Sequence, residues 1–122
     1  MERELQRAHD LQMGFMPHSP PHLTGYDIAG RCLPAEQVGG DLFQYSPLIN
    51  SRLALSLADV TGHAMAAAIP VVFFKGLLES QLAFDLSLEE LFARLNELLN
   101  RILSDRTFVC FVMAQLDPEK RN

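Results

Sequence analysis

Two aspartates stand at the two ends of one apolar stretch, and glycines accompany both. Asp41 follows Gly39 and Gly40 directly, whereas Asp59 ends the run SRLALSLAD and is followed by Val-Thr-Gly-His. Hard divalent cations such as Mg²⁺ and Mn²⁺ take oxygen ligands, chiefly carboxylates, backbone carbonyls and water. Two carboxylates at the ends of adjacent strands converge on one point if the segment between them folds as a hairpin. The pair therefore predicts part of a metal site.

The glycines beside these aspartates have separate expected roles. Gly39 and Gly40 remove side chains next to Asp41, so that backbone or substrate can approach closely. Gly62 relaxes the chain between Asp59 and the next segment, where a helix N-terminus would favour an anion such as phosphate. A single aspartate in such a place is most often a turn residue or a helix cap. The two together, with their glycines, favour the metal site.

The strands that position these residues can be expected from hydrophobic patterns. Segment 42–58 is long enough for a hairpin with its turn near SPLINS. In 51–59, leucines occupy one face and small residues the other, so that something can pack closely over the small face. Residues 38–45 can supply the first strand of the hairpin and 26–33 an earlier strand. Residues 107–116 are apolar on both faces and predict a central strand that is covered on each side.

Three helices are expected around these strands. Residues 2–16 carry apolar side chains at spacings of three and four, and Pro17 ends that segment. The apolar run 63–83 is too long for a strand. It predicts a helix in which Pro70 either marks the start of the regular part or causes a kink. Ser87 opens the third helix with the capping-box pattern Ser-Leu-Glu-Glu, and a leucine-rich stripe follows it.

This order of elements predicts an α+β fold with layered packing. We expect residues 1–16 to form a linker or signalling helix and 17–122 to form a domain truncated at its C-terminus, because its last strand lacks neighbours. The N-terminal helix either packs on its own sheet or continues a helix that pairs with a second subunit. Exposed sheet edges and uncovered apolar faces would favour a homodimer.

Composition and charge narrow the class of protein. The chain has 122 residues, 48% of them hydrophobic and 20% charged, which is typical of one globular domain or a piece of one. Acidic residues outnumber basic ones, 15 to 10, so charge gives no reason to expect nucleic acid or an anionic membrane as partner. We expect no membrane-spanning stretch, no signal peptide and a cytoplasmic location. Cys32 and Cys110 are then expected to be reduced, buried core thiols, with a disulfide as the alternative.

The two aspartate motifs resemble a known family. LPAEQVGGDLFQY, followed by LALSLADVTGHAMAAA, is similar to the N-terminal half of bacterial sporulation and stress-response phosphatases. These form the SpoIIE/RsbU-like branch of the metal-dependent type 2C (PPM) protein serine/threonine phosphatases. The segment before the glycines, RAHDLQMGFMPHSPPHLTGYDIAGRCLPA, is similar to that family as well, and so are LFARLNELLNRIL and FVCFVMAQLD. The resemblance therefore covers nearly all of the chain.

The resemblance implies an α-β-β-α sandwich with a two-metal centre, of which this chain carries the N-terminal part. Asp59 matches the bridging carboxylate, Asp41 matches a second acidic ligand, and the backbone carbonyl of Val60 matches a further contact to Mn²⁺ or Mg²⁺. Asp59 and Asp41 would thus be the catalytic residues, and the metals would activate a water that attacks phosphorus in line, without a phospho-enzyme intermediate. The residues expected to support the site are Gly39, Gly40, Gly62 and His63.

The sequence also departs from the family pattern. Gln44 stands where the family usually has a second acid, and Ala64 replaces the glycine after the histidine, which narrows the approach to the metals or alters the loop. The family's remaining acidic ligands would lie beyond Asn122, and Asp105 and Asp117 do not match them. With two carboxylates, we expect weak metal affinity and little or no activity from this chain by itself.

The resemblance also implies partners. The expected substrate is phosphoserine or phosphothreonine on a regulatory protein such as an anti-sigma-factor antagonist, and the expected neighbour is an upstream sensor or response-regulator domain. His63 either polarises the phosphate or supports the loop. The alternative function is that of a catalytically dead pseudo-phosphatase that acts as a regulatory binding or dimerisation module, and Gln44 and Ala64 lean toward it.

Overall fold

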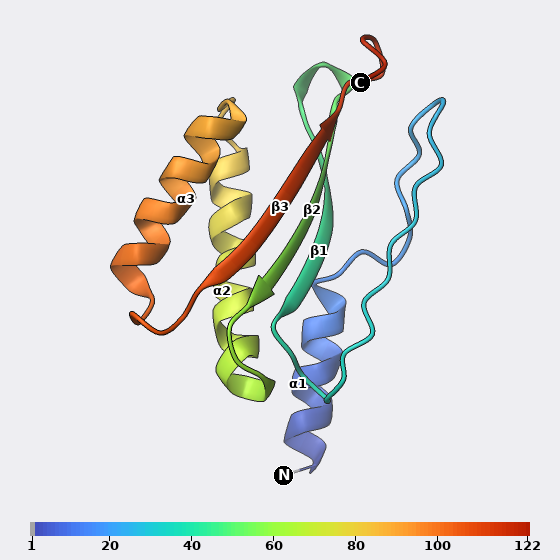
Figure 1. Ribbon diagram of the computed structural model, residues 1–122. Helices are drawn as coiled ribbons and strands as arrows, with labels where there is room; N and C mark the ends of the chain where they lie inside the picture. Colours follow the sequence, from blue (N-terminus) through green and yellow to red (C-terminus); the bar gives the residue numbers. More distant parts are fainter. Residues whose placement is uncertain (1) are drawn as a thin grey trace.

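The fold is α+β, as predicted. A computed structural model describes residues 2–122, in which α2 and α3 lie against one face of a three-stranded antiparallel sheet with the order β1-β2-β3 (Figure 1). Helix α1 lies beside the end of the sheet at which β1 begins. The elements in chain order are α1 (Glu2–Gly14), β1 (Asp41–Pro47), the 3-10 helix η1 (Ile49–Ser51), β2 (Leu53–Val60), α2 (Ala64–Leu82), α3 (Leu88–Ile102) and β3 (Val109–Leu116).

Strands β1 and β2 form the predicted hairpin. Their register pairs Asp41 with Asp59 at the open end and Pro47 with Leu53 next to the turn. The turn contains η1, in which Asn50 has a φ of 60°, a left-handed conformation that asparagine adopts more readily than most residues. Because side chains alternate between the two faces of a strand, this register places the two aspartates on one face of the sheet.

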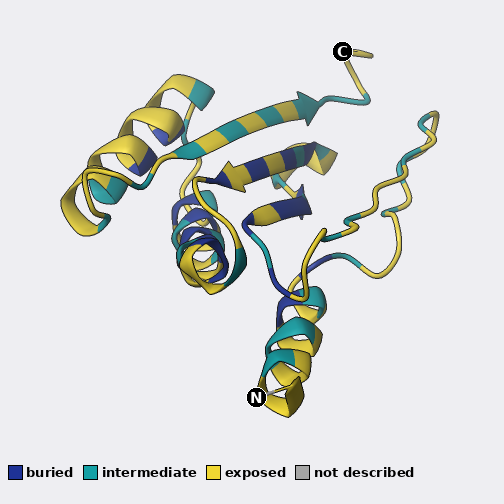
Figure 2. Ribbon diagram, turned by 60° about the horizontal axis from the view of Figure 1, so that its bottom comes forward, coloured by how far each residue is buried: buried dark blue, intermediate teal, exposed yellow. Residues whose placement is uncertain are grey.

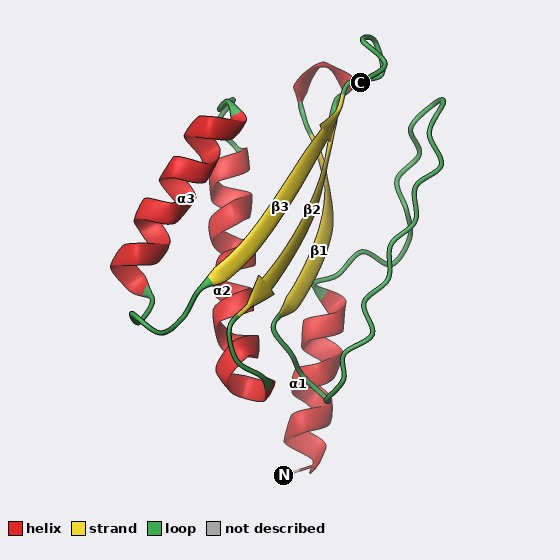
Figure 3. Cartoon of the chain, viewed as in Figure 1, coloured by secondary structure: helices red, strands yellow, loops and turns green. Residues whose placement is uncertain are grey.

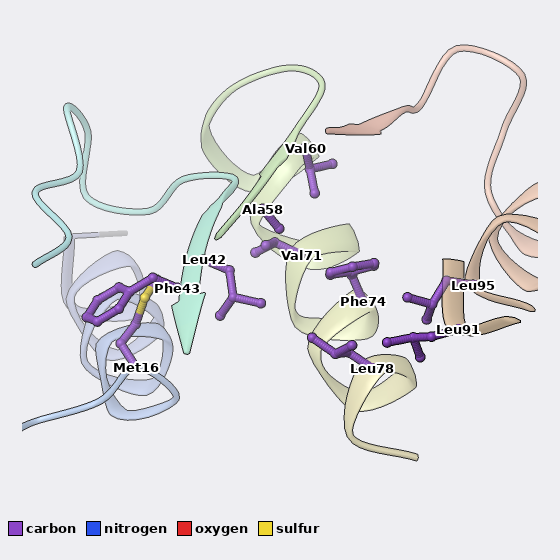
Figure 4. Close-up of a cluster of buried hydrophobic side chains, with 10 residues drawn as sticks. All are labelled: Met16, Leu42, Phe43, Ala58, Val60, Val71, Phe74, Leu78, Leu91 and Leu95. Carbon is purple, nitrogen blue, oxygen red and sulfur yellow. The ribbon is translucent and has the colours of Figure 1, made fainter. Parts of the chain in front are cut away.

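Most of the hydrophobic core lies between the sheet and the two helices that cover one face of it, and Met16 and Phe43 belong to the core on the other face of β1. Ala54 and Ala58, on the small face of β2, are buried, and α2 packs over this face with Val71, Phe74 and Leu78. Burying each large side chain of this kind stabilises the fold by about 1.5–3 kcal/mol. Figure 4 shows the cluster, which comprises Met16, Leu42, Phe43, Ala58, Val60, Val71, Phe74, Leu78, Leu91 and Leu95.

Helix α2 is continuous from Ala64 and contains Pro70, so the regular helix does not begin at the proline. By length and composition alone, this helix could cross a membrane, which corrects the expectation that no stretch is long enough. A core helix passes the same test, and the packing of its buried face against the sheet accounts for part of its apolar composition, whereas Met65, Ile69 and Val72 are exposed on the rest of the helix. Helix α3 starts where the capping box predicts: the Ser87 Oγ accepts a hydrogen bond from the Glu90 N–H at 3.1 Å.

The strand predicted for residues 26–33 is wrong. Apart from an isolated bridge between Leu23 and Tyr26, residues 17–40 contain no regular strand or helix (Figure 3). The reason is visible at Gly30, which lies so close to β1 that a Cβ there would collide with the Tyr45 hydroxyl and, at 2.7 Å, with the Phe43 ring. This part of the chain therefore contacts side chains of β1 instead of continuing the sheet by backbone hydrogen bonds.

Strand β3 is an edge strand, not the central strand that its apolar pattern predicts. Within residues 2–122 it pairs with β2 alone, and the face of the sheet away from α2 and α3 is open along β2 and β3, whereas Met16 and the segment around Gly30 cover it at β1. Figure 2 shows the resulting alternation of exposed and less exposed residues along β3, where Val112 is 61% exposed. Leu57 on β2 is 63% exposed on the same face. The expectation of a buried thiol is also wrong for Cys110, which is exposed, although both cysteines are free.

Candidate metal centre

Asp41 and Asp59 face each other where β1 begins and β2 ends. The pKa of the Asp41 carboxyl is raised above its ordinary value, first by partial burial, then by the negative charge of Asp59 and a hydrogen bond shared with it. The structure thus brings together two carboxylates that lie 18 positions apart in the sequence, 59 − 41.

No protein cation lies in ion-pair contact with the two aspartates in the described part of the chain, although Arg31 lines a hollow that both of them border. Within residues 2–122, no Lys, Arg or His side chain forms an ion pair with Asp41 or Asp59. Two adjacent carboxylates without a positive partner repel each other, and a divalent cation between them would reverse the sign of that interaction. The donor atoms are hard oxygens, the type that Mn²⁺ and Mg²⁺ prefer. The arrangement therefore fits such a cation.

The ligand set in the described part of the chain is small. No group of three or more His, Cys, Asp and Glu side chains among residues 2–122 is placed to hold a metal ion. A hard divalent cation takes about six oxygen ligands. The two carboxylates would consequently need water, backbone carbonyls or groups from elsewhere in the protein to complete the coordination.

The Val60 backbone lies directly beside Gly40. The Val60 N–H donates to the Gly40 carbonyl at 2.9 Å, and a Cβ on Gly40 would lie 2.8 Å from the Val60 carbonyl oxygen and 2.8 Å from the Ala67 Cβ. A Cβ on Gly39 would meet no atom within 4 Å. Close approach of the backbone therefore explains the glycine at 40, next to Asp41, and does not explain the one at 39.

The loop between β2 and α2 contains two left-handed residues. Gly62 has a φ of 97° and Ala64 has a φ of 52°. Glycine adopts this conformation without strain, whereas alanine does not. The departure from the family pattern at 64 thus creates local backbone strain. His63 is exposed between them, with its Nδ1 3.4 Å from a Glu36 carboxylate oxygen. This contact joins the loop before α2 to the segment before β1.

The strain at Ala64 leads to a prediction. Ala64→Gly should raise the free energy of unfolding by about 1 kcal/mol. An alanine in the left-handed region costs about 1–2 kcal/mol, and glycine removes this cost. Glycine also raises the conformational entropy of the unfolded chain, which lowers the net gain in stability. Urea unfolding measures the difference. Ala66→Gly, at an exposed position of the same helix, is the matched control and should lose about 1 kcal/mol. Two losses of equal size would show that Ala64 is not strained.

The aspartates border two hollows. A cleft of about 260 Å³ lies at the start of α2, and its lining includes Glu36, Gly62 and His63 as well as both carboxylates. A second hollow of about 320 Å³ lies on the open face of the sheet, and its lining includes Cys32 and Cys110. Burial, and then the charge of Asp41, raise the pKa of the Cys32 thiol. The carboxylates can therefore be reached from either side.

Gln44 does not lie in this site. Its side chain is 3% exposed and belongs to the face that α2 covers, opposite to that of the aspartates. Its oxygen accepts from Lys75 Nζ at 3.0 Å, while its nitrogen donates to Ser46 Oγ at 2.8 Å and to Glu79 Oε1 at 3.2 Å. Lys75 Nζ also lies 3.6 Å from Glu79 Oε1. The second departure from the family pattern thus belongs to a polar network beneath α2.

The raised pKa of Asp41 has a consequence for stability. A raised folded-state pKa means that folding disfavours the ionised carboxylate, so stability is lost as the pH rises through the ordinary carboxyl pKa toward the raised value. In EDTA at pH 7, Asp41→Asn should therefore be more stable than the wild type, and at pH 3 the two should be alike. The gain should stay below about 1 kcal/mol, because solvent screens this exposed carboxyl.

Urea unfolding at the two pH values measures this effect. Asp105→Asn, in the exposed loop before β3, serves as the control and should show no such difference between the two pH values. A metal-free Asp41→Asn protein that is less stable than the wild type at pH 7 would contradict the assigned repulsion.

Comparison with known proteins identifies relatives of this chain. The family model of stage II sporulation protein E (SpoIIE) matches residues 50–122, which is more than half of the chain and includes Asp59. Protein IcfG of Synechocystis sp. is 32% identical over 75 residues, or 62% of this chain. The matched segment makes up 12% of the length of IcfG.

Proposed function

Because the chain belongs to the SpoIIE family of PP2C-like phosphatase domains, we propose that it supplies the first two carboxylate ligands of a metal-dependent protein serine/threonine phosphatase. The observation that carries this proposal is the pairing of Asp41 with Asp59 across the hairpin, on one face of the sheet, where neither carboxylate forms an ion pair with a side chain of residues 2–122. The pairing needs one aspartate from each of the two motifs, and the register of the β1–β2 hairpin places the two opposite each other.

The residues of the chain have distinct roles in the proposed site. Asp59 and Asp41 would hold Mn²⁺ or Mg²⁺, and the Val60 carbonyl, fixed against Gly40, is a third candidate donor. The bound metals would lower the pKa of water and offset the charge of the phosphoryl group. The exposed His63 and the N-terminus of α2 border the same cleft, where a phosphate group would be admitted.

We further propose that the substrate is a phosphoserine or phosphothreonine on a regulatory protein of the anti-sigma-factor-antagonist type. This assignment is supported by the sequence resemblance alone, as are an upstream sensor or response-regulator domain and a cytoplasmic location. The open face of the sheet would be covered by a further part of the phosphatase domain, which would also add the remaining metal ligands. Residues 1–122 by themselves would then show little or no activity.

A pseudo-phosphatase that only binds a partner is the second candidate. The strained Ala64 beside the site favours it, since the family's usual glycine would fit this backbone without cost. Gln44 no longer counts toward it, because its side chain contacts Lys75 on the other face of the sheet.

Titration of Mn²⁺ into the full-length protein tests the proposal. The substrates are p-nitrophenyl phosphate and peptides that carry phosphoserine, phosphothreonine or phosphotyrosine, and EDTA provides the blank. We expect hydrolysis that depends on Mn²⁺ and favours the first two peptides. Mn²⁺ binding without hydrolysis of any substrate would support the pseudo-phosphatase, and the absence of both would contradict the metal centre.

A further inference from the structure

Helix α1 carries one buried residue, and that residue is polar. Gln12 is 7% exposed, whereas its apolar neighbours Leu11 and Phe15 are 67% and 44% exposed. The amphipathic pattern of the helix predicts the reverse. Burying an amide is unfavourable unless its hydrogen-bonding groups find partners, so the position of Gln12 requires a specific partner.

That partner is the backbone of the residue two positions before Asp41. The Gln12 Nε2 donates to the Gly39 carbonyl oxygen at 2.6 Å, and the Gly39 N–H donates to the Gln12 Oε1 at 2.9 Å. The amide thus satisfies both backbone groups of Gly39, as a neighbouring strand would. Gly39 has no Cβ to contact, and what holds it in place is this pair of hydrogen bonds.

Gly40 and Asp41, the next two residues, are held by contacts with β2 and α2. Gly40 is pressed against Val60 and Ala67 and accepts the Val60 N–H at 2.9 Å. Asp41 follows and pairs with Asp59 in the first register position of the hairpin. The chain that enters β1 is therefore fixed by α1 on one side and by β2 and α2 on the other.

Two further contacts place α1 against this segment. His9, one turn before Gln12, contacts the carbonyl of Gln37 through its Nδ1. Met16, one turn after it, is buried in the core beside Phe43 of β1 (Figure 4). Of the two polar contacts, the one made by Gln12 is nearer to the ligand along the chain, because Gly39 comes two positions before Asp41 and Gln37 comes four positions before it.

We propose that Gln12 is a positioning residue of the metal centre. Its amide holds the Gly39 backbone so that Asp41 stays opposite Asp59, ready to share a cation with it. This inference rests on the proposed function, because the role of Gln12 is defined by the ligand that it positions. The same two hydrogen bonds also hold α1 against the chain that enters β1. The packing of α1 and the affinity for metal are therefore interdependent.

Three variants of the full-length protein test this role. Gln12→Met keeps the length of the side chain and removes both hydrogen bonds. Gln12→Glu keeps the acceptor for the Gly39 N–H and loses the donor to its carbonyl. Gln6→Met is the matched control, because Gln6 is exposed on the same helix and its side chain donates a hydrogen bond to Asp10 of that helix. The probe is Mn²⁺ alone, followed by calorimetric titration, by the rise in Tm that Mn²⁺ produces, and by hydrogen exchange of the 39–42 amides.

Gln12→Met should weaken Mn²⁺ binding about tenfold, as loss of a residue that orients a metal ligand commonly does. Its rise in Tm with a fixed Mn²⁺ concentration should shrink, and the Gly39 amide should exchange faster. Gln12→Glu should lie between it and the wild type, and Gln6→Met should match the wild type. A residue that only stabilised α1 would lower the Tm without metal and leave the Mn²⁺-induced rise unchanged, and that result would overturn the proposal.

Asp59→Asn separates this inference from the function beneath it. If Asp59→Asn abolishes Mn²⁺ binding while Gln12→Met leaves it intact, the metal centre stands and the role of Gln12 is refuted. If the wild type does not bind Mn²⁺ at all, both the metal centre and the role of Gln12 are refuted. Should Gln12→Met fail to fold, Gln12→Glu decides alone: wild-type Mn²⁺ affinity refutes the role and a reduced affinity supports it.

Discussion

Asp59→Asn is expected to reduce the Mn²⁺-dependent phosphatase activity of the full-length protein by about a thousandfold. Metal ions contribute several kcal/mol to such reactions, and each 1.4 kcal/mol or so corresponds to a factor of ten in rate. Asparagine keeps the shape of the side chain and removes its charge and one of its two oxygen donors. Initial rates with p-nitrophenyl phosphate and a phosphoserine peptide, measured over a range of Mn²⁺ concentrations, give kcat/KM for the comparison.

Two controls make this result specific. Asp105→Asn removes a carboxylate from an exposed loop and should keep wild-type activity. In EDTA, Asp59→Asn should be no less stable than the wild type, because it removes one of two carboxylates that repel each other. Activity within tenfold of the wild type would refute the assignment, and loss of activity together with loss of the fold would attribute the defect to folding instead.

Local sequence patterns predicted the parts of the fold that depend on neighbouring residues. The hairpin followed from its alternating leucines and its turn residues, and Ser87 marked the start of α3 because the cap acts over three positions. The meeting of Asp41 and Asp59 was also predictable, since a hairpin brings its two ends together whatever packs around it. Each of these inferences spans a single element or one tight connection.

The errors arose where packing over long distances decides the outcome. Residues 26–33 have the alternation of a strand, but Gly30 lies against the Phe43 ring and the Tyr45 hydroxyl, and the segment forms no ladder. Strand β3 is apolar on both faces, a pattern that predicts cover on each side and cannot say what provides it. The helices supply that cover on one face within residues 2–122, and Val112 lies on the other.

The polar contacts that matter most near the site left no signal in the sequence. Gln12 interrupts no pattern, because a glutamine on a charged helix is ordinarily solvated, and its partner Gly39 lies 27 positions away. Gln44 and Lys75 meet across 31 positions in the same manner. A glutamine in a strand is a weak hint of a buried amide. Only the three-dimensional arrangement shows which backbone or side chain satisfies it.

Gly40→Ala should lower the free energy of unfolding by about 3 kcal/mol, at the upper end of what overpacking usually costs. The new methyl group would lie 2.8 Å from the Val60 carbonyl oxygen and 2.8 Å from the Ala67 Cβ. Neither neighbour is the end of a flexible side chain, because one belongs to the β2 backbone and the other to the rigid start of α2. Relief therefore requires a shift of β1 away from β2, and Asp41 would move with it.

Gly39→Ala is the control, one residue away. Its methyl group would meet nothing within 4 Å, so its stability should change by no more than about 0.5 kcal/mol. Urea unfolding and Mn²⁺ titration of the two variants should both separate them, with Gly40→Ala losing stability and metal affinity together. Equal behaviour of the two variants would show that the backbone approach at Val60 does not constrain the chain. The paired glycines would then serve flexibility, because neither position would depend on the absence of a side chain.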